Sequence, residues 1–327
     1  MKPKILFIMH MPPPVHGAAM VGQYIHDSKL INREFDSHYI NLTTAKNLQD
    51  FGKVGMRKLL DFIFNTDMFR LKKLDILGSK AELASLPEGK LLINTINAHS
   101  YNTARKDSLF AEALTNGDVL IPDGVSIVKA CRWIKAKSLP KERIAGWDLF
   151  EFEMNRLEKL GAMCHGAGGE QSDDARGATE AKKTVMFMGS SQKVLDLIVK
   201  RAAEVYPHLK VVTYSPPYKP EFSDEDNRAI VDAINAADPD LLWIGMTAPK
   251  QEKWTYSHWE ELNIHCHVGT IGAVFDFFAG TVERAPLWWQ RNGLEWLYRL
   301  LKEPKRMWRR YIIGNTLFLW NMLKEKS

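Results

Sequence analysis

The sequence predicts an α/β protein with a doubly wound, mostly parallel, Rossmann-like sheet and a basic helical C-terminal appendage. From about residue 90 onward, short apolar runs alternate with segments of helical periodicity, as in consecutive βα units. The apolar runs show little polar alternation, which is typical of strands covered by helices on both faces. From Arg284 to the end, ten basic residues stand against three acidic ones, which predicts an appendage of a different character.

Each element follows from its local pattern. Strands are predicted at 91–94, 119–121, 184–188, 210–214, 241–244 and 265–268, and helices at 103–114, 126–134, 193–205, 224–236 and 249–262. Asn116-Gly117 should end the first helix, and the second strand should run into Pro122-Asp123-Gly124. The Gly-, Ala-, Ser- and Asp-rich stretch at 160–182 fits none of these patterns and predicts a flexible insertion.

These patterns divide the chain into three parts. Residues 1–72 form an N-terminal extension with one strand, a Pro-rich loop and a basic helical pattern from Lys53 to Lys73. Residues 73–285 form the α/β domain, with the insertion at 160–182. Residues 286–327 form the appendage, which reads as two helices broken at Pro304.

Composition excludes several classes of protein. With 327 residues, 45% hydrophobic and 25% charged, the chain can bury a large core and is not intrinsically disordered. Its three cysteines are far apart, which argues against a disulfide framework or a structural zinc site and favours a reducing cytoplasm. No run reaches the roughly 18 apolar residues of a membrane span, and the N-terminus lacks a signal-peptide cleavage site, so any membrane contact should be peripheral.

The appendage is rich in tryptophan as well as in cations, since five of the ten tryptophans follow Arg284. Cations beside Trp and Tyr suit an anionic membrane surface. Some arginines could instead bind a diphosphate with two hydrogen bonds each. A third, purely structural role is also open, in which the cations form a solvated helix face and the tryptophans pack into the body. Nothing resembles a nucleic-acid recognition module, so no nucleic-acid partner is expected. A homo-oligomer remains open.

In parallel α/β sheets, ligands bind beyond the carboxyl ends of the strands. There the sequence places polar residues and glycines: Thr95, Asn97, Asp123, Gly189, Gly245 and the residues 269–272. Backbone N–H groups where helices open after Gly189 and after Gly269 have the geometry to hold a phosphate, although glycines also serve ordinary turns.

Asp123 is the carboxylate that could act as a general base. Between Pro122 and Gly124 at a strand end, it can project into the crevice, partly desolvated. The same spacing also permits Asp123 to cap the helix that begins near Ser126.

The segment from Gly245 to Glu252 places Pro249 at a helix start. Gln251 and Glu252 could hydrogen-bond a base or sugar hydroxyls, or Glu252 could face the helix dipole while Lys250 stays solvated. Two acidic strings, 224–226 and 238–240, look like metal sites for sugar nucleotides, but their positions favour structural roles. A GxxxxGK[ST] loop, GxGxxG and GxSxG are all absent.

Together these strings resemble the WecG/TagA/CpsF family of bacterial glycosyltransferases, over about Leu74 to Phe318. The motifs that carry the resemblance are Thr95-Ile96-Asn97, DVLIPDG (118–124), RIAGWDL (143–149), APKQEKW (248–254), FDFFAG (275–280), Arg284-Ala285-Pro286, GLEWLYR (293–299), and Glu303-Pro304 followed by Arg306, Arg309 and Arg310.

The resemblance implies an inverting, metal-independent transfer from a UDP-sugar to a polyprenyl-diphosphate-linked sugar in cell-surface polysaccharide synthesis, on the inner face of the plasma membrane, with no cofactor. It implies Asp123 as the base. It implies Thr95, Asn97, Arg143 and Gln251 in donor or acceptor binding, and the C-terminal arginines match an appendage that closes the site and touches the membrane. The predicted substrate-binding residues are these four together with Gly189, Gly245, Lys250, Glu252, Asp276, Arg299, Arg306, Arg309 and Arg310.

The chain departs from the family at 160–182, which is longer and more polar than expected, and at its N-terminus. KILFIMHMPPPVHGAA resembles the opening strand and loop of a GT-B glycosyltransferase of the family 4 type. That segment leaves an alternative function open, a non-catalytic sugar-nucleotide-binding or scaffolding subunit. The identity of the transferred sugar is not readable from the sequence.

Overall fold

The computed structural model describes residues 4–9, 17–28, 31, 36–41, 69–166 and 182–326, and the chain divides into two compact units, 1–66 and 67–327. In the first unit, strand β1 (Lys4–Met9), helix α1 (Gly17–His26) and strand β2 (Asp36–Asn41) form a parallel βαβ arrangement. The predicted first strand is confirmed, whereas α1 and β2 were not foreseen. Most of the helical pattern predicted from Lys53 lies outside the described residues, and its end is a 3₁₀ turn, η2 (Leu71–Lys73).

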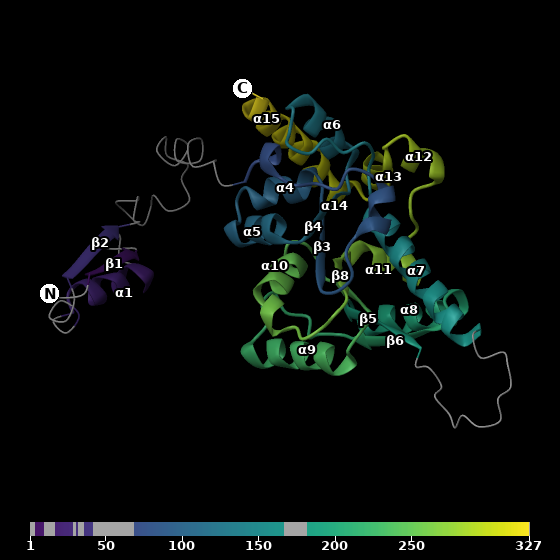
Figure 1. Cartoon of the computed structure of the whole chain (residues 1–327). Coiled ribbons are helices and arrows are strands. Elements are labelled where there is room, and N and C mark those ends of the chain that lie inside the picture. The colour runs from purple at the N-terminus through teal and green to yellow at the C-terminus, as the bar shows by residue number, and fades with distance from the viewer. Residues whose placement is uncertain are drawn as a thin grey trace. The chain divides into compact units, whose positions relative to one another are not determined.

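The second unit contains a six-stranded parallel sheet in the order β4-β3-β8-β7-β5-β6 (Figure 1). Its strands are β3 (Leu91–Ile96), β4 (Val119–Pro122), β5 (Lys183–Gly189), β6 (Leu209–Tyr214), β7 (Leu241–Gly245) and β8 (His267–Thr270). The predicted parallel α/β fold is therefore confirmed. Strand β8 begins two residues later than predicted, because Ile264 and Cys266 are buried without being part of its ladder.

Helices cover both faces of this sheet. The α-helices before the appendage are α4 (Ala98–Ala104), α5 (Ser108–Asn116), α6 (Val125–Trp133), α7 (Gly146–Gly166), α8 (Gln192–Val205), α9 (Asp224–Ala237), α10 (Lys250–Ser257) and α11 (Gly272–Ala279), with 3₁₀ turns η3 (Lys80–Ser85) and η4 (Trp259–Glu261). Along β5, Phe187 packs with α7, α8 and α11 on one face, while Met186 and Met188 pack with α9 and α10 on the other. This two-sided burial explains the near absence of polar alternation in the strands.

Three further predicted boundaries were wrong. The helix expected at 249–262 ends at Ser257, and the 3₁₀ turn η4 follows it. The single helix expected at 103–114 is two helices, because the Asp107 side chain accepts a hydrogen bond from the Phe110 N–H and caps α5. The insertion expected from residue 160 begins later, because α7 continues to Gly166; residues 167–181 lie outside the described part of the chain.

Both acidic strings have the structural roles that were predicted. Asp226 completes a capping box with Ser223 at the start of α9. Asp240 accepts a hydrogen bond from the Thr184 N–H at 2.7 Å and pairs with Lys183 at 2.8 Å. Asp238 and Asp240 precede β7, whereas Asp226 lies in the loop-to-helix turn after β6 and pairs with Lys219 at 2.7 Å.

The appendage consists of α12 (Leu287–Arg291), α13 (Glu295–Lys302), α14 (Pro304–Trp308), a π-helical turn η5 (Arg309–Ile313) and α15 (Gly314–Lys326). Pro304 starts α14, so the predicted break is confirmed. The inner face of α15 packs on α4, where Phe318 meets Tyr101 edge-on at 5.4 Å between ring centroids. Among the described helices, none is long and apolar enough to cross a membrane.

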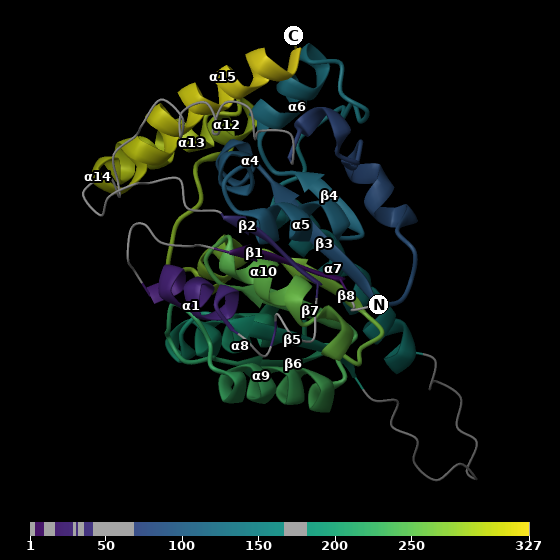
Figure 2. The same cartoon turned by 90° about the vertical axis from the view of Figure 1, so that its left-hand side faces the viewer.

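Glu325 fastens the end of α15 to the α/β body. Its buried carboxylate accepts hydrogen bonds from the backbone N–H groups of Leu71 (3.0 Å) and Lys72 (2.9 Å) and from the Tyr101 hydroxyl. These partners precede and follow β3, and Phe318 and Met322 of α15 belong to a buried core cluster. Figure 2 shows α15 running along the edge of the second unit beside α4 and α6.

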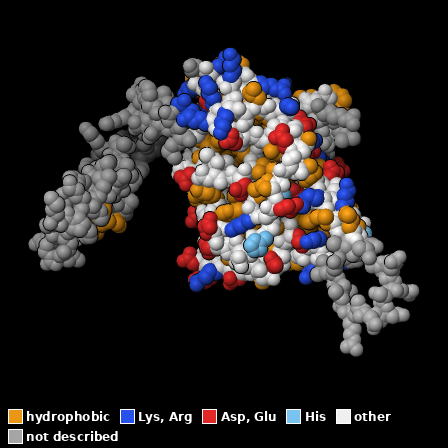
Figure 3. All heavy atoms as spheres, in the orientation of Figure 1, with side chains coloured by type: hydrophobic (Ala, Val, Ile, Leu, Met, Phe, Trp, Pro, Cys, Tyr) orange, Lys and Arg blue, Asp and Glu red, His pale blue; other side chains and the backbone are white. Residues whose placement is uncertain are grey.

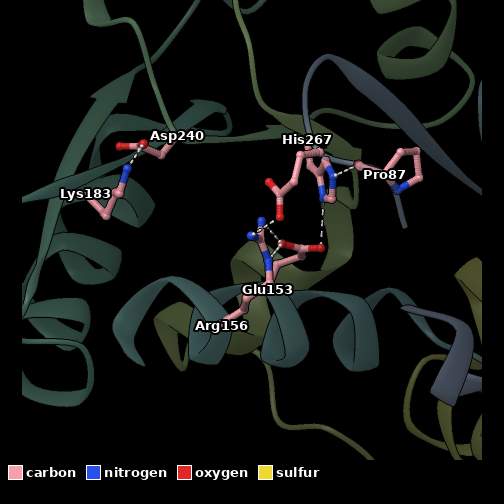
Figure 4. Close-up of polar contacts among 7 residues, drawn as sticks. Pro87, Glu153, Arg156, Lys183, Asp240 and His267 are labelled. Atoms are coloured by element: carbon pink, nitrogen blue, oxygen red, sulfur yellow. Dashed lines mark hydrogen bonds and ion pairs between the residues drawn. The ribbon is translucent and has the colours of Figure 1, made fainter. Parts of the chain in front are cut away.

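A buried ionic cluster lies at the opposite, amino-terminal edge of the sheet (Figure 4). His267, the first residue of β8, contacts Glu153 through Nδ1 at 2.9 Å and the Pro87 carbonyl through Nε2 at 2.9 Å. Arg156 holds the other oxygen of Glu153 at 2.8 Å. Burial lowers the pKa of His267, but hydrogen bonds to Glu153 and Pro87 outweigh it, and the pKa is raised above its ordinary value.

The raised pKa predicts a stability that falls as the pH rises. A group with a higher pKa in the folded state stabilises fully below its unfolded value, near 6.5, and loses that contribution as the pH passes the folded value. We expect His267→Gln to cost about 2 kcal/mol of unfolding free energy at pH 6, the order of a hydrogen bond to a charged group. Urea unfolding of both proteins from pH 6 to 9 should show this gap shrinking, and a constant gap would contradict the prediction.

Candidate active site

The carboxyl ends of β3 and β4 bring Asn97 and Asp123 together. The two strands are neighbours in register, with Ile96 opposite Pro122, so the residues that follow them lie side by side. Asn97 caps α4 by accepting hydrogen bonds from the N–H groups of His99 and Ser100, both at 3.0 Å. Its Nδ2 points to Asp123 and lies 3.4 Å from Oδ2.

Asp123 does not cap the following helix. The N-cap residue of α6 is Gly124, and no side chain caps this helix end. The half-buried carboxylate instead faces Asn97, while the Asp123 N–H donates to the Ile96 carbonyl at 2.9 Å and fixes the backbone. The spacing permitted Asp123 to act as a general base or to cap α6. The geometry rules out the cap and leaves the carboxylate at the rim of the sheet, where a general base would lie. Thr95 is half-buried on β3, two residues before Asn97.

Arg284, which interacts with the charge of this carboxylate, belongs to a cluster with Arg143, Glu295 and Arg299. Glu295 of α13 joins Arg143 (Nη1 to Oε2, 3.1 Å) to Arg299 (Nη2 to Oε1, 3.0 Å). Arg284 lies with its guanidinium 5.6 Å from the Trp147 ring centroid. Burial lowers the pKa of Arg284, whereas Glu295, Asp148 and Asp123 act in the opposite direction, so its charge is close enough to Asp123 to interact. The appendage thus brings Arg299 to the rim.

The arginines of the π-helical turn differ in position. Partial burial of the His99 ring, together with the positive charge of Arg310, lowers the pKa of His99 to about 4. His99 is in the first turn of α4, so Arg310 lies close to this turn. The Nε atom of Arg310 is buried and has no hydrogen-bond partner among the described residues. Arg309 is exposed, with its guanidinium 5.4 Å from the Trp308 ring. The side chain of Arg306 lies outside the described part of the chain.

Gln251 joins the carboxyl ends of β7 and β8. Its Oε1 accepts hydrogen bonds from the Met246 N–H (3.1 Å) and the Gly272 N–H (3.2 Å), and its Nε2 donates to Glu252 at 2.9 Å. Burial raises the pKa of Glu252 to about 7, and its second oxygen is buried with no partner among the described residues. Gln251 therefore holds the rim in shape, a role that its sequence position did not reveal.

The remaining predicted residues are spread along the rim. Gly189 has φ +119°, and a side chain there would start 2.3 Å from the Gly245 carbonyl oxygen, so the two strand ends approach closely. Lys250 turns away from Asp123: its Nζ donates to the Lys219 carbonyl at 2.6 Å and lies 3.5 Å above the Phe222 ring. Asp276, on the second turn of α11, contacts Thr281. These two residues do not join the arginine cluster.

Sequence reasoning missed Glu295 and Arg284. Both stand inside quoted motifs, and the spacing of Glu295 and Arg299 on one helix was a signal of pairing. Within the described residues, no group of three or more His, Cys, Asp or Glu side chains could hold a metal ion.

The profile of the glycosyl transferase WecG/TagA/CpsF family matches residues 63–327. The chain belongs to this family. The βαβ unit of residues 4–41 precedes the match, and its resemblance to a GT-B enzyme stays a prediction.

Two bacterial proteins are similar to this chain in sequence. Both are N-acetylglucosaminyldiphosphoundecaprenol N-acetyl-beta-D-mannosaminyltransferases. The protein from Bacillus subtilis (strain 168) is 29% identical over 236 residues, which cover 72% of this chain and 80% of the relative. The protein from Bacillus spizizenii (strain ATCC 23059 / NRRL B-14472 / W23) is 31% identical over 235 residues, with the same coverage of both chains.

Proposed function

We propose that this chain transfers a sugar from a UDP-sugar to a polyprenyl-diphosphate-linked sugar in cell-surface polysaccharide synthesis. Membership of the family and the names of its two relatives support this reaction, with N-acetylmannosamine as the first sugar to test. The observation that carries it is the Asp123 carboxylate, which lies at the rim of the sheet, caps no helix and interacts with the charge of Arg284.

In the proposed reaction, the acceptor hydroxyl attacks the anomeric carbon of the donor while Asp123 takes its proton. The bond from that carbon to the β-phosphate oxygen breaks, and UDP leaves with the electron pair. One displacement inverts the anomeric centre. Arg143, Arg284 and Arg299 lie where they can balance the developing diphosphate charge, so we propose that no metal is needed.

Asn97 holds Asp123 in place and, with Thr95, lines the proposed acceptor side. Gln251 keeps the ends of β7 and β8 in register on the proposed donor side, where Gly189 and Gly245 allow the strand ends and the Phe275 ring to approach closely. Arg310, beside α4, is proposed to bind the acceptor diphosphate.

We also propose peripheral binding to the inner face of the plasma membrane. The helices from α14 to α15 expose an apolar stripe opposite their packed face, here called the outer stripe. It consists of Trp308, Ile312, Ile313, Leu319, Trp320 and Leu323, each between 42% and 57% exposed. An exposed apolar face flanked by cations suits a helix that lies in the membrane interface.

The purified full-length chain tests this function when it is mixed with UDP-N-acetylmannosamine and a short-chain polyprenyl-diphosphate N-acetylglucosamine. We expect release of UDP and a disaccharide-lipid product by mass spectrometry. UDP-glucose and UDP-N-acetylglucosamine serve as comparison donors. Binding of UDP-sugars without turnover of any donor would contradict the proposal and favour a non-catalytic subunit.

A further inference from the structure

A cluster of cations on the α/β body lies next to the end of the outer stripe. Lys326, at the end of α15, has its Nζ 5.0 Å from the ring centroid of Trp133 on α6. Glu325 binds the Leu71 and Lys72 N–H groups of η2, and the Lys137 N–H donates to the Lys72 carbonyl at 2.9 Å. The ends of α15 and α6 and the turn η2 therefore meet at one corner of the second unit.

This corner is strongly basic. Its exposed cations, here called the basic corner, are Lys72, Lys73, Lys135, Lys137, Lys324 and Lys326. The exposed Asp75 is a nearby acid and pairs with Lys137 at 2.8 Å. Figure 3 shows Lys and Arg side chains gathered over α15 and α6, whereas acidic side chains predominate lower on the same face.

Apolar side chains lie among these cations. Trp133 is 39% exposed and Leu139 is 58% exposed, and Trp320 and Leu323 of the outer stripe lie on the last turns of α15. Tryptophan and lysine side by side are characteristic of the level of lipid headgroups, where the ring enters the interface and the ammonium meets phosphate. A nucleic-acid backbone is bound through cations that neutralise its phosphates, and exposed leucines contribute nothing to that contact. The leucines therefore favour a lipid surface.

We propose that the basic corner binds the anionic membrane surface together with the outer stripe, so that the α/β body itself contacts lipid headgroups. This inference rests on the proposed function, because it gives the peripheral enzyme a second point of contact. Four of the six cations lie outside the appendage, on η2 and after α6. Sequence analysis missed them because the body is near neutral in total charge and only folding brings its cations together.

The test is co-sedimentation of the full-length protein with vesicles of phosphatidylcholine that contain 30% phosphatidylglycerol. The variant carries Lys72→Glu, Lys73→Glu and Lys135→Glu, all on exposed side chains of the body. We expect its vesicle affinity to fall roughly a hundredfold, since each cation near an anionic leaflet contributes about tenfold or less. The matched control carries Lys193→Glu, Lys200→Glu and Lys210→Glu on α8 and β6 and should lose much less.

Turnover of the short-chain acceptor in the absence of vesicles separates this inference from the proposed function. Both triple variants should retain wild-type turnover, and circular dichroism checks their folding. Equal vesicle affinity of the two variants, or no preference of the wild type for anionic over pure phosphatidylcholine vesicles, would overturn the role of the basic corner. Loss of binding to an acidic protein or to RNA, with vesicle binding intact, would overturn it as well.

Discussion

Asp123→Asn is expected to lower turnover about a thousandfold while UDP binding stays within a few-fold of wild type. The amide keeps the size of the carboxylate and can still contact Asn97, but it cannot take the proton of the acceptor hydroxyl. General-base catalysis is worth about 10² to 10⁴ in rate, which sets the expected loss. Initial rates with a saturating donor and calorimetric titration of UDP measure the two quantities separately.

A matched control is Asp232→Asn, which removes an exposed carboxylate on α9. We expect the control to keep full activity. Turnover of the Asp123 variant within threefold of wild type would exclude Asp123 as the base. Loss of UDP binding together with turnover would instead show that Asp123 shapes the donor site, and the proposed division of roles would be wrong.

The second large effect is expected from Glu325→Ala. This change leaves two backbone N–H groups, of Leu71 and Lys72, and the Tyr101 hydroxyl without their buried acceptor. Each buried polar group without a partner costs about 1 to 3 kcal/mol, so the unfolding free energy should fall by at least about 3 kcal/mol. Urea unfolding followed by tryptophan fluorescence measures this loss.

Glu260→Ala, which removes an exposed carboxylate of η4, is the control and should change the unfolding free energy by less than about 0.5 kcal/mol. Equal stability of the two variants would show that α15 is not fastened through Glu325. The expected loss also bears on experimental design, because deleting the appendage would remove Phe318 and Met322 and expose Tyr101, which packs with them in the core. Membrane binding is therefore better tested with substitutions than with truncation.

The sheet and its rim could be predicted from local patterns. Buried parallel strands are apolar on both faces, and this signal located all six strands of the second unit. The proximity of Asn97 and Asp123 follows from two adjacent strands that end in register. The division between α4 and α5 could not be seen, because Asp107 fits the helical periodicity and acts as a cap only in the folded chain.

The contacts between the appendage and the body could not be predicted from the sequence. Glu295 pairs with Arg143, which precedes it by 152 residues, and Glu325 binds the N–H of Leu71, which precedes it by 254 residues. Such pairs depend on tertiary packing, which periodicity does not encode. For the same reason the sequence does not show that the Gln251 amide holds two loop ends together, and its role in ligand binding stays a prediction.

The short helix α4 connects two distant tasks. Its cap, Asn97, contacts Asp123, and four and five residues later Tyr101 and Asn102 contact α15, the helix that carries part of the outer stripe. Seven helical residues span only about 10 Å. An acceptor whose lipid tail stays in the bilayer presents its hydroxyl at a height fixed by its diphosphate and first sugar. In the proposed function, the fold would therefore hold Asp123 at a fixed height above the bilayer, and would select glycolipids by how far they stand above it as well as by their stereochemistry.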